Sequence, residues 1–428
     1  MRVFGFLNLI LVFNLYGQDL GEVQIYNSEN SELIYNQINC IEFDNENRIW
    51  VGTQNGLSIF DQTNNTWDNI YQATENSPTP WSCLPTNVIT ALEWDDFSTP
   101  QKMFIGTASG ITDVYWESGE FGDQGQLAAW CPAFGTSCSP NGGFIKSLLH
   151  NNTESQIWVG STDGLCVEGL GGEGDWLLQN TETGFYSNNI TSLRQNLNNN
   201  MIVIGTMNGG LVTYDGEFNI YYSSNSTILD NTVLDANFDT ENNIIICTPQ
   251  AGLGVLTNNG SWIWLNTINS SIPTNSLKNI IIDNNDDLWI TTLENGLIHY
   301  KDNIFYNYST TNSNLPDNKI NCLLFDDDNN LWLGTDSEGL VKINTPISNI
   351  NEKEEDGSVL YPSVFKTSFF IDLTKLSRVK ILNIKGKQIY NKNLSKGLHE
   401  ITLKNIPNGI YFVQIFSERL SNWKIIKY

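Results

Sequence analysis

The sequence is short of the residues that many catalytic and metal sites use. Its 428 residues include only three histidines, His150, His299 and His399, which are far apart along the chain. Scattered histidines give little support to a histidine-based acid–base or metal site, and His299 is expected to be partly buried packing on a strand. The motifs G-x-S-x-G and H-E-x-x-H are absent. Carboxylates are plentiful, but no motif singles out a pair. We expect no catalytic residue, no metal ligand and no cofactor.

Basic residues are scarce over most of the chain. Residues 1–357 carry 10 Lys and Arg against 44 Asp and Glu, a net charge of −34. Residues 358–428 carry 12 against 3, a net charge of +9. The change of sign predicts a domain boundary. An acidic main region would repel a phosphate backbone, so we expect no nucleic-acid partner. In the basic region lysines alternate with apolar residues, which is typical of solvated strand faces.

Long apolar runs are absent except at the N-terminus. One arginine, an apolar run from Val3 to Leu15 and the small Gly17 form the pattern of a secretion signal peptide, predicted over residues 1–17. The run is too short for a comfortable transmembrane helix. We therefore predict export, with no transmembrane span in the mature protein.

The seven cysteines include no C-x-x-C spacing that would indicate a zinc site. Export permits disulfides, and Cys131 and Cys138, in CPAFGTSC, are the predicted pair. Cys40 and Cys322 hold equivalent places in repeated segments and are a second candidate pair. The alternative for the cysteines of the strand-like segments is a role as small buried core residues. Those four residues are Cys40, Cys166, Cys247 and Cys322.

The chain repeats one phrase along most of its length. RIWVGTQNGLSIFD, at 48–61, returns in altered form as QIWVGSTDGLCVE at 156–168 and LWLGTDSEGLVKI at 331–343. Aligning the phrase divides the chain into seven units spaced by 54, 54, 45, 42, 44 and 43 residues. The aligned anchor positions are Gly52, Gly106, Gly160, Gly205, Cys247, Thr291 and Gly334. Short strands repeated at this period predict the blades of a β-propeller.

Each unit has the same internal order of strands and turns. First comes an apolar strand that often ends in Asp, whose side chain can cap the following turn. A bulky second strand, a glycine turn and a third strand follow, and a looser aromatic strand closes most units. The turn glycine permits a positive φ. The anchor glycine leaves no side chain where strands crowd near an axis. The strand-end residues are Asp44, Asp95, Asp239, Asp283 and Asp326, and the turn residues are Gly56, Gly110, Gly164, Gly296 and Gly339.

The seventh unit lacks its last strand, and the N-terminus can supply it. Residues 22–40 align without gaps with residues 304–322 at a constant offset of 282 residues, which places Tyr26 on Tyr308. A strand near Val23–Asn27 should therefore complete the last blade and close the ring, which removes the exposed edges of an open array.

Two insertions interrupt the repeat, at 72–87 and 116–143. Loops carry binding in such folds, while blades carry stability. Trp81 and Trp130 lie in these insertions and are our candidate ligand-binding residues, because aromatic rings can stack on a sugar or a partner. The alternative is that each caps a local hydrophobic cluster.

Two other motifs are weak. GLGGEG, at 169–174, has the spacing of a nucleotide-binding loop but follows no buried parallel strand and opens no helix. The run from Asp326 to Asn330 is acidic, but it lacks the glycine and the distal glutamate of a calcium loop and stands where other units place a hairpin turn. We interpret it as a turn, with calcium binding as the alternative.

The repeat resembles the two-component regulator propeller repeat, whose pattern is N-I-x-x-I-x-x-D, L-W-[VI]-G-T and x-x-G-L-x-x-[FY]. Its closest copies are NCIEFDNENRIWVGTQNGLSIFD and NCLLFDDDNNLWLGTDSEGL. The fifth unit departs from it, with Cys247 and Pro249 in place of Gly-Thr. The resemblance implies relatives that form periplasmic sensor domains of hybrid histidine kinases. This chain has neither a kinase sequence nor a transmembrane span, so a direct signalling role is not expected.

The last block, from YPSVF to KIIKY, alternates short strands with tight turns and predicts a small β-sandwich. It resembles the C-terminal sorting domain of the type IX secretion system of Bacteroidetes, through VKILNIKGKQIY and LKNIPNGIYFVQI. Ser363 and Val364 depart from the usual Asn-Pro of the first motif. The resemblance implies the type IX secretion machinery as a partner, then cleavage of the tail and release or surface attachment. An ordinary Ig-like adhesion domain is the alternative.

These observations predict an all-β protein: a seven-bladed β-propeller at 22–346, a linker at 347–360 and an Ig-like β-sandwich sorting domain at 361–428. We expect a secreted or outer-membrane-surface monomer that acts as a non-catalytic binding or adhesion module for a protein or a glycan. One alternative is a propeller polysaccharide lyase or hydrolase. Another is an extracytoplasmic sensor module that works with a separate membrane partner.

Overall fold

A computed structural model provides the coordinates of the protein. It describes residues 20–72, 84–96, 101–115, 144–151, 153–154, 156–168, 176–344, 359–361, 364–365, 367–383, 387–404, 406–407, 409–416 and 420–427. These residues form strands, turns and loops, and none is helical. The described part of the chain thus has no helix with the length and hydrophobicity that crossing a membrane requires. The chain divides into two compact units, Met1–Thr345 and Pro346–Tyr428.

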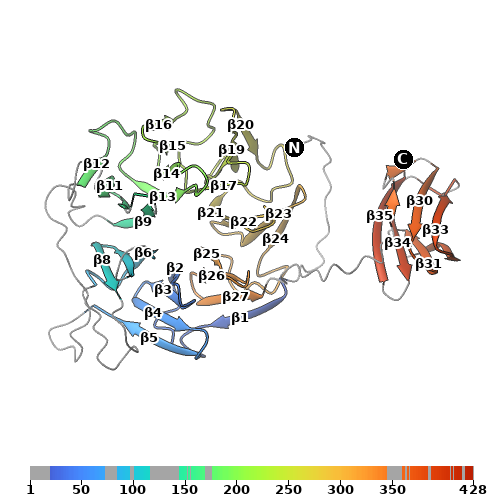
Figure 1. Ribbon diagram of the computed structural model, residues 1–428, viewed down its shortest axis with the longest axis horizontal. Coiled ribbons are helices and arrows are strands. Elements are labelled where there is room, and N and C mark those ends of the chain that lie inside the picture. Colours follow the sequence, from blue (N-terminus) through green and yellow to red (C-terminus); the bar gives the residue numbers. More distant parts are fainter. Residues whose placement is uncertain are drawn as a thin grey trace. The chain divides into compact units, whose positions relative to one another are not determined.

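The first unit is a seven-bladed β-propeller around a central opening, which confirms the predicted fold (Figure 1). The first strand of each blade borders the opening. These inner strands are β2 (Ile38–Phe43), β6 (Ile89–Asp95), β9 (Ile145–Asn151), β13 (Ile190–Gln195), β17 (Asp235–Phe238), β21 (Leu277–Ile282) and β25 (Ile320–Phe325). Each inner strand contacts the inner strand of the next blade, and β25 contacts β2, so the ring is closed.

The remaining strands follow outward in antiparallel order. The second strands are β3 (Ile49–Thr53), β7 (Lys102–Thr107), β10 (Gln156–Ser161), β14 (Ile202–Thr206), β18 (Ile244–Cys247), β22 (Leu288–Thr292) and β26 (Leu331–Thr335). The third strands are β4 (Gly56–Asp61), β8 (Gly110–Tyr115), β11 (Leu165–Glu168), β15 (Leu211–Tyr214), β19 (Leu253–Leu256), β23 (Leu297–Lys301) and β27 (Leu340–Asn344). The fourth are β5 (Thr66–Ile70), β12 (Trp176–Gln179), β16 (Phe218–Tyr221), β20 (Trp262–Leu265), β24 (Ile304–Tyr308) and β1 (Glu22–Tyr26).

Burial is greatest at the second strand of a blade and lower at the inner and outermost strands. Every residue of β3, β22 and β26 is buried, because neighbouring blades cover both faces of the sheet. The outer strands β5 and β24 are mostly half-buried or exposed. The apolar second strand of the repeat is therefore the centre of each blade's core.

The anchor glycine is required by contact with the next blade. A Cβ atom added to Gly334 would lie 2.5 Å from Cγ2 of Ile38 and would also overlap Sγ of Cys322. Gly52 and Gly106 meet Ile89 and Ile145 of their next blades in the same way, at 2.6 and 2.5 Å. The predicted crowding is therefore confirmed, and its source is an isoleucine of the following inner strand.

The predicted closure of the ring is also confirmed. Strand β1 pairs antiparallel with β27, from Glu22 opposite Asn344 to Tyr26 opposite Leu340. The last blade therefore has the order β25, β26, β27 and β1. The Tyr26 ring stacks on Trp332 with 5.9 Å between centroids.

Asparagines tie the loops between blades, a use that explains part of the high asparagine content. The backbone N–H groups of Ser223, Thr267 and Thr310 donate to the side chains of Asn231, Asn275 and Asn318, at 2.9, 2.8 and 2.9 Å. Each bond spans eight residues of a loop that leads to the next inner strand.

The second unit contains two sheets around one core. One sheet has the order β28 (Val359–Tyr361), β30 (Ser368–Leu373) and β33 (Gly397–Thr402). The other has the order β29 (Val364–Phe365), β35 (Leu420–Lys427), β34 (Gly409–Phe416), β31 (Ser377–Asn383) and β32 (Gln388–Leu394). Phe369 and Ile401 of the first sheet pack in one core with Val379 and Val413 of the second. This arrangement is compatible with the predicted Ig-like sandwich.

Candidate functional site

The residues that the sequence singled out for binding lie in the insertions. Trp81, Trp130, Cys131 and Cys138 are all outside the described residues. The same is true of the predicted signal peptide and of the GLGGEG segment. Their roles therefore remain predictions.

The strand cysteines behave in two ways. Cys166 is buried in the core, as predicted, and is also disulfide-bonded, which the sequence did not indicate. Cys40, Cys247 and Cys322 are free, so the second candidate disulfide is not formed. Burial raises the pKa of the Cys40 thiol, to which the nearby Cys322 also contributes, and raises that of Cys322 to about 12. Both thiols are therefore protonated and unreactive near neutral pH.

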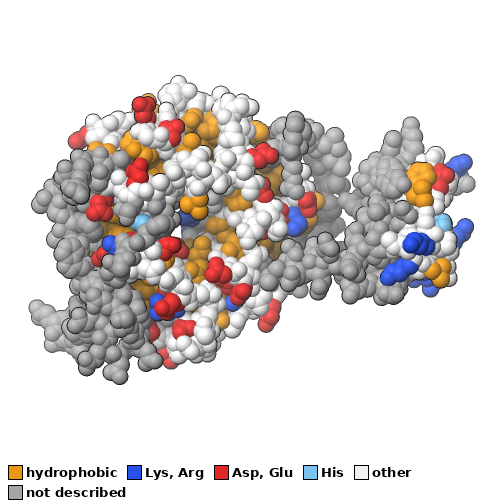
Figure 2. Space-filling model, in the orientation of Figure 1, with side chains coloured by type: hydrophobic (Ala, Val, Ile, Leu, Met, Phe, Trp, Pro, Cys, Tyr) orange, Lys and Arg blue, Asp and Glu red, His pale blue; other side chains and the backbone are white. Residues whose placement is uncertain are grey.

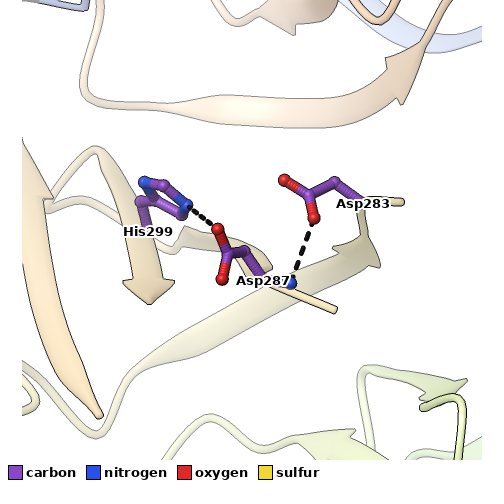
Figure 3. Close-up of side chains that lie close together, drawn as sticks. All are labelled: Asp283, Asp287 and His299. Carbon is purple, nitrogen blue, oxygen red and sulfur yellow. Dashed lines mark hydrogen bonds and ion pairs between the residues drawn. The ribbon is translucent and has the colours of Figure 1, made fainter. Parts of the chain in front are cut away.

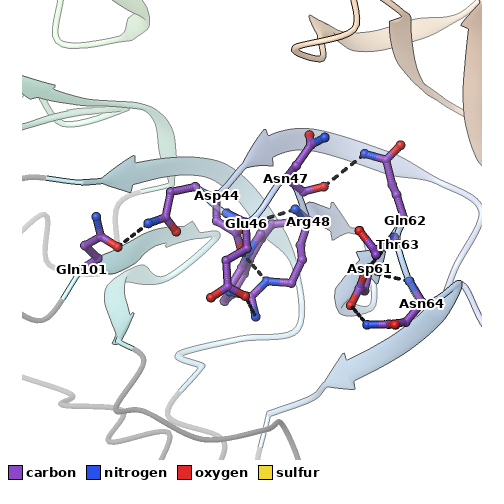
Figure 4. Close-up of polar contacts among 11 residues, drawn as sticks. Asp44, Glu46, Asn47, Arg48, Asp61, Gln62, Thr63, Asn64 and Gln101 are labelled. Atoms are coloured by element: carbon purple, nitrogen blue, oxygen red, sulfur yellow. Dashed lines mark hydrogen bonds and ion pairs between the residues drawn. The ribbon is translucent and has the colours of Figure 1, made fainter.

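The strand-end aspartate makes more bonds than the turn alone requires (Figure 4). In the first blade Asp44 accepts hydrogen bonds from the backbone N–H of Glu46 and of Arg48, each at 3.0 Å. Its other oxygen accepts from Nε of Arg48 at 2.6 Å and from Nε1 of Trp50 at 2.8 Å. The predicted cap is confirmed, and the sequence did not reveal the bond to the tryptophan of the next strand.

The same hydrogen-bonded arrangement of a strand-end aspartate and a tryptophan recurs in the seventh blade. Asp326 accepts from the backbone N–H of Asn330 at 2.7 Å and from Nε1 of Trp332 at 2.9 Å. Asn329 in this turn has a φ of 62°. These donors show that the acidic run at 326–330 is a hairpin turn of the common type. The recurring Asp and Trp of the repeat therefore hold a blade together.

A cluster that could hold a metal ion lies in the sixth blade. Ligand atoms of Asp283, Asp287 and His299 lie within 4.8 Å of one another (Figure 3). However, Nζ of Lys301 donates to Oδ2 of Asp287 at 3.0 Å, and Nε1 of Trp289 donates to Asp283 at 3.3 Å. The two carboxylates are already engaged with protein donors.

His299 has a structural counterpart in the seventh blade. The His299 ring stacks on Trp289 with 3.9 Å between centroids, while Nε2 lies 3.5 Å from Asp287. Trp289 pairs with His299 across two strands, and Trp332 pairs with Lys342 in the same way. Nζ of Lys342 lies 4.8 Å from the centroid of the Trp332 ring. Burial lowers the pKa of His299, although the charge of Asp287 opposes this. The expectation that His299 is a partly buried packing residue on a strand is confirmed. We do not assign a metal site here.

Charged side chains gather at the central opening, which sequence inspection missed. In the first, second and fourth blades, one residue of the inner strand pairs with the anchor glycine. Two residues further along the inner strand stand Glu42 on β2, Glu93 on β6 and Arg194 on β13. They therefore lie at equivalent heights on inner strands. Figure 2 shows the ring hollowed at its centre, with a basic side chain visible in the hollow. Alignment of the seven units at this position could have revealed the three charges, because the other units carry Leu, Ile or Asn there.

We define the axial cluster as Glu42, Glu93, Arg194 and Asp235. Its three acidic side chains accept hydrogen bonds from backbone N–H groups. Glu93 accepts from the N–H of His150 in the next blade at 2.9 Å. Glu42 accepts from the N–H of Phe43 at 3.0 Å. Asp235 accepts from the N–H of Ile280, also in the next blade, at 3.0 Å. These bonds fix where the carboxyl groups stand around the opening.

Burial shifts the titration of both glutamates. Desolvation raises the pKa of Glu42 to about 7, although the N–H of Phe43 and the charge of Arg194 oppose it. Desolvation and the charge of Glu42 together raise the pKa of Glu93 to about 8. Burial also raises the pKa of Asp235, against the charge of Arg194. Carboxyls with raised pKa in a concave site are typical of functional centres, although structural networks can shift pKa as well.

These shifts predict that stability falls as pH rises. Both glutamates have folded-state pKa values above the ordinary 4.5, so the folded chain holds more protons than the unfolded chain between about pH 4.5 and 8. The free energy of unfolding should therefore decrease through that window. We expect Glu42→Gln and Glu93→Gln each to be more stable than wild type at pH 8.5, by more than about 1 kcal/mol, since one pKa unit corresponds to about 1.4 kcal/mol.

Urea unfolding at several pH values measures this effect. The matched control is Glu29→Gln, which removes a charge from an exposed loop residue and should follow the wild-type pH dependence. Parallel pH curves for the axial variants and wild type would show that the two carboxyl groups are not buried as described.

Two family models match the chain. The two component regulator propeller model matches residues 32–55 and 314–337, and the secretion system C-terminal sorting domain model matches residues 359–427. No curated protein matches the chain.

Solved structures share the fold. The extracellular domain of the proposed hybrid two component system BT3049 from B. thetaiotaomicron has a TM-score of 0.59 at 16% identity, over 95% of this chain and 57% of that one. PorZ, a surface component of the type-IX secretion system of Porphyromonas gingivalis, has a TM-score of 0.54 at 15% identity, over 92% and 60%. The extracellular domain of the proposed one component system BT4673 from B. thetaiotaomicron has a TM-score of 0.53 at 18% identity, over 92% and 52%.

This chain spans between about half and three fifths of the length of those structures, and such identities show a common fold alone. The sorting-domain match places the protein outside the cell or on the outer-membrane surface. The chain thus contains two-component regulator propeller repeats and, at residues 359–427, a type IX secretion system C-terminal sorting domain.

Proposed function

We propose that the protein is an extracellular binding or adhesion module that recognises a glycan or a protein without transforming it. The supporting observation is that the recurrent Asp, Trp and Gly of the repeat have structural roles: they make the contacts within and between blades. What is particular to this chain lies outside that scaffold, in the insertions at 72–87 and 116–143. Loops on a rigid scaffold are where such modules bind.

The insertions supply the first candidate contacts. Trp81 and Trp130 each offer a large ring that can stack on a sugar or fill a pocket in a partner protein. We expect Trp81→Ala or Trp130→Ala to weaken binding by tenfold or more, the usual result for an aromatic hot spot of about 2 kcal/mol. A glycan array and capture of surface proteins by the exported chain would measure this. Tyr35→Ala, which removes an exposed ring outside the insertions, is the control.

Unchanged binding in both tryptophan variants would exclude these residues as the site. An absence of any glycan or protein ligand would count against the proposed function itself. The two results are separable, because the first needs a detected ligand and the second is the lack of one.

A polysaccharide lyase or hydrolase is the second candidate, favoured by the two carboxyl groups of Glu42 and Glu93 on neighbouring inner strands. Two carboxyls with raised pKa values of about 7 and 8 could exchange protons near neutral pH. Incubation with neutral and acidic polysaccharides, followed by measurement of new reducing ends and unsaturated products, tests this. Product formation that is lost in Glu93→Gln would replace the non-catalytic proposal.

A further inference from the structure

The propeller has two arginines, and they are used differently. Within residues 22–346 these are Arg48 and Arg194. Nε of Arg48 lies 2.6 Å from Asp44, and Nη1 lies 3.1 Å from Glu46, so this residue holds a turn. Arg194 is exposed on β13 and makes no hydrogen bond or ion pair with any residue that the structure describes. A guanidinium group has five N–H donors, so Arg194 has donors to offer a ligand.

Basic residues also stand on the inner strands of this strongly acidic ring, beside Glu42, Glu93 and Asp235. Three of the basic residues of the described propeller, Lys146, Arg194 and Lys278, stand on inner strands. The others are Arg48, Lys102, Lys301, Lys319 and Lys342. Nζ of Lys278 donates to the side chain of Asn321 at 2.6 Å, and burial lowers the pKa of Lys146. Since residues 1–357 carry only 10 Lys and Arg against 44 Asp and Glu, three bases on the inner strands are a notable share of the positive charge available to a ligand.

We propose that the central opening binds a carboxylate group of an extracellular ligand, with Arg194 as the anchor and the carboxyl groups of Glu42 and Glu93 as further hydrogen-bond partners. The inference rests on the proposed binding function and names the chemistry of its ligand. The carboxylate can belong to an acidic sugar or to a peptide, and the experiment below separates these sources.

The geometry gives each group a role. The planar guanidinium of arginine pairs with a carboxylate through two parallel hydrogen bonds. Oε1 of Glu42 and Oε1 of Glu93 already accept backbone N–H groups. The second oxygen of each glutamate has no hydrogen-bond partner among the described residues. When protonated, that oxygen can donate to the ligand, and the ligand's carboxylate thereby gains partners on both sides of the opening.

The neutral form of the glutamates makes this binding depend on pH. The charged and titratable groups that act on Glu93 are Glu42, Arg194 and Asp95, and the ring of His150 lies 3.5 Å from Asp95. Arg194 also acts on Glu42 and on Asp235. Below about pH 7 both glutamates are largely neutral, so their charges no longer oppose an anion beside Arg194. Above about pH 8 their two negative charges repel an anionic ligand.

Calorimetric titration of the exported full chain tests the proposal. The probes are glucuronate, with glucose as its neutral match, and N-acetylalanine, with its amide as the neutral match. At pH 6 we expect wild type to bind at least one carboxylate probe at millimolar concentrations and neither neutral match. If only glucuronate binds, the source is an acidic sugar; if only N-acetylalanine binds, it is a peptide.

Three variants locate the site. Arg194→Ala should weaken binding by at least about tenfold, since a charge-assisted pair is lost. Lys319→Ala, which removes a positive charge from an exposed rim position, should leave affinity unchanged. Wild-type affinity should fall by about 10- to 100-fold between pH 6 and pH 8.5 as the two glutamates ionise. The double variant with Glu42→Gln and Glu93→Gln should retain its pH 6 affinity at pH 8.5, since glutamine stays neutral.

Several results would overturn the axial site. These are no binding of either carboxylate by wild type at pH 6, equal binding by Arg194→Ala, or an affinity for the carboxylate probe that rises between pH 6 and pH 8.5. If glycan or protein ligands are found while these tests fail, the axial site is wrong and the binding function stands. If no ligand of any kind is found, both are wrong. Thermal unfolding of each variant shows whether its fold is retained.

Discussion

Deletion of residues 20–27 is expected to open the ring and destabilise the propeller by more than about 4 kcal/mol. This segment contains β1, the fourth strand of the last blade, whose five residue pairs with β27 would be lost. Leu20 is buried in the core beside β26, and Val23 and Tyr26 pack against it and against the neighbouring cluster. Each apolar side chain removed from a core costs about 1.5–3 kcal/mol. That is a large part of the 5–15 kcal/mol that stabilises an ordinary domain.

Urea unfolding and size-exclusion chromatography would measure the effect. The deletion leaves β27 as an exposed edge, so association between chains is expected as well as a lower unfolding midpoint. The control returns residues 20–27 to the chain after Asn344 through a short turn, where they can form the same antiparallel pairs in continuous order. Restored stability in that variant would assign the loss to ring closure. Equal stability of the deletion and wild type would mean that β1 does not close the ring.

Replacement of Gly334 by alanine is expected to cost about 2–3 kcal/mol of unfolding free energy. The added methyl group would lie 2.5 Å from Cγ2 of Ile38, which is fully buried, and would overlap Cys322. Neither neighbour can move away without disturbing the contact between the last blade and the first. Overpacking of this kind costs typically 1–3 kcal/mol and sometimes more.

Gly216→Ala is the matched control, because it separates crowding from backbone strain. Gly216 has a φ of 104°, but a Cβ atom added there meets nothing within 4 Å. It should cost only about 1 kcal/mol, the usual effect of a strained turn position. Chemical unfolding of both variants gives the comparison. A loss at Gly334 no larger than that at Gly216 would show that the blades can separate enough to admit a methyl group.

Much of the scaffold could be predicted from sequence because its signals are local. The spacing of the anchor glycines indicated seven blades, and the match between residues 22–40 and 304–322 indicated how the ring closes. The strand-end aspartates indicated capped turns. In each case a short stretch of chain carries the whole signal, since a strand, a turn and a period need no distant partner.

The axial cluster could not be predicted in the same way. Glu42, Glu93 and Arg194 belong to the first, second and fourth blades, and each alone looks like an ordinary charged residue in a strand. Closure of the ring brings them around one opening, where low solvation and mutual charge shift their pKa values. The disulfide of Cys166 was missed for a related reason, because bonding depends on which cysteine the fold brings near.

The sequence by itself determined the repeat, the number of blades, the closing strand and the export signal of the tail. Each of these depends on the repeat period, the alignment of repeats or a local motif, all of which can be read from the sequence. Only the tertiary structure decided which polar residues serve the scaffold and which remain available. It showed the bond from Asp44 to Trp50 inside one blade and left Arg194 exposed at the axis. The physical reason is that hydrogen bonding, burial and charge coupling depend on distances between blades, and those distances exist only after the ring has closed.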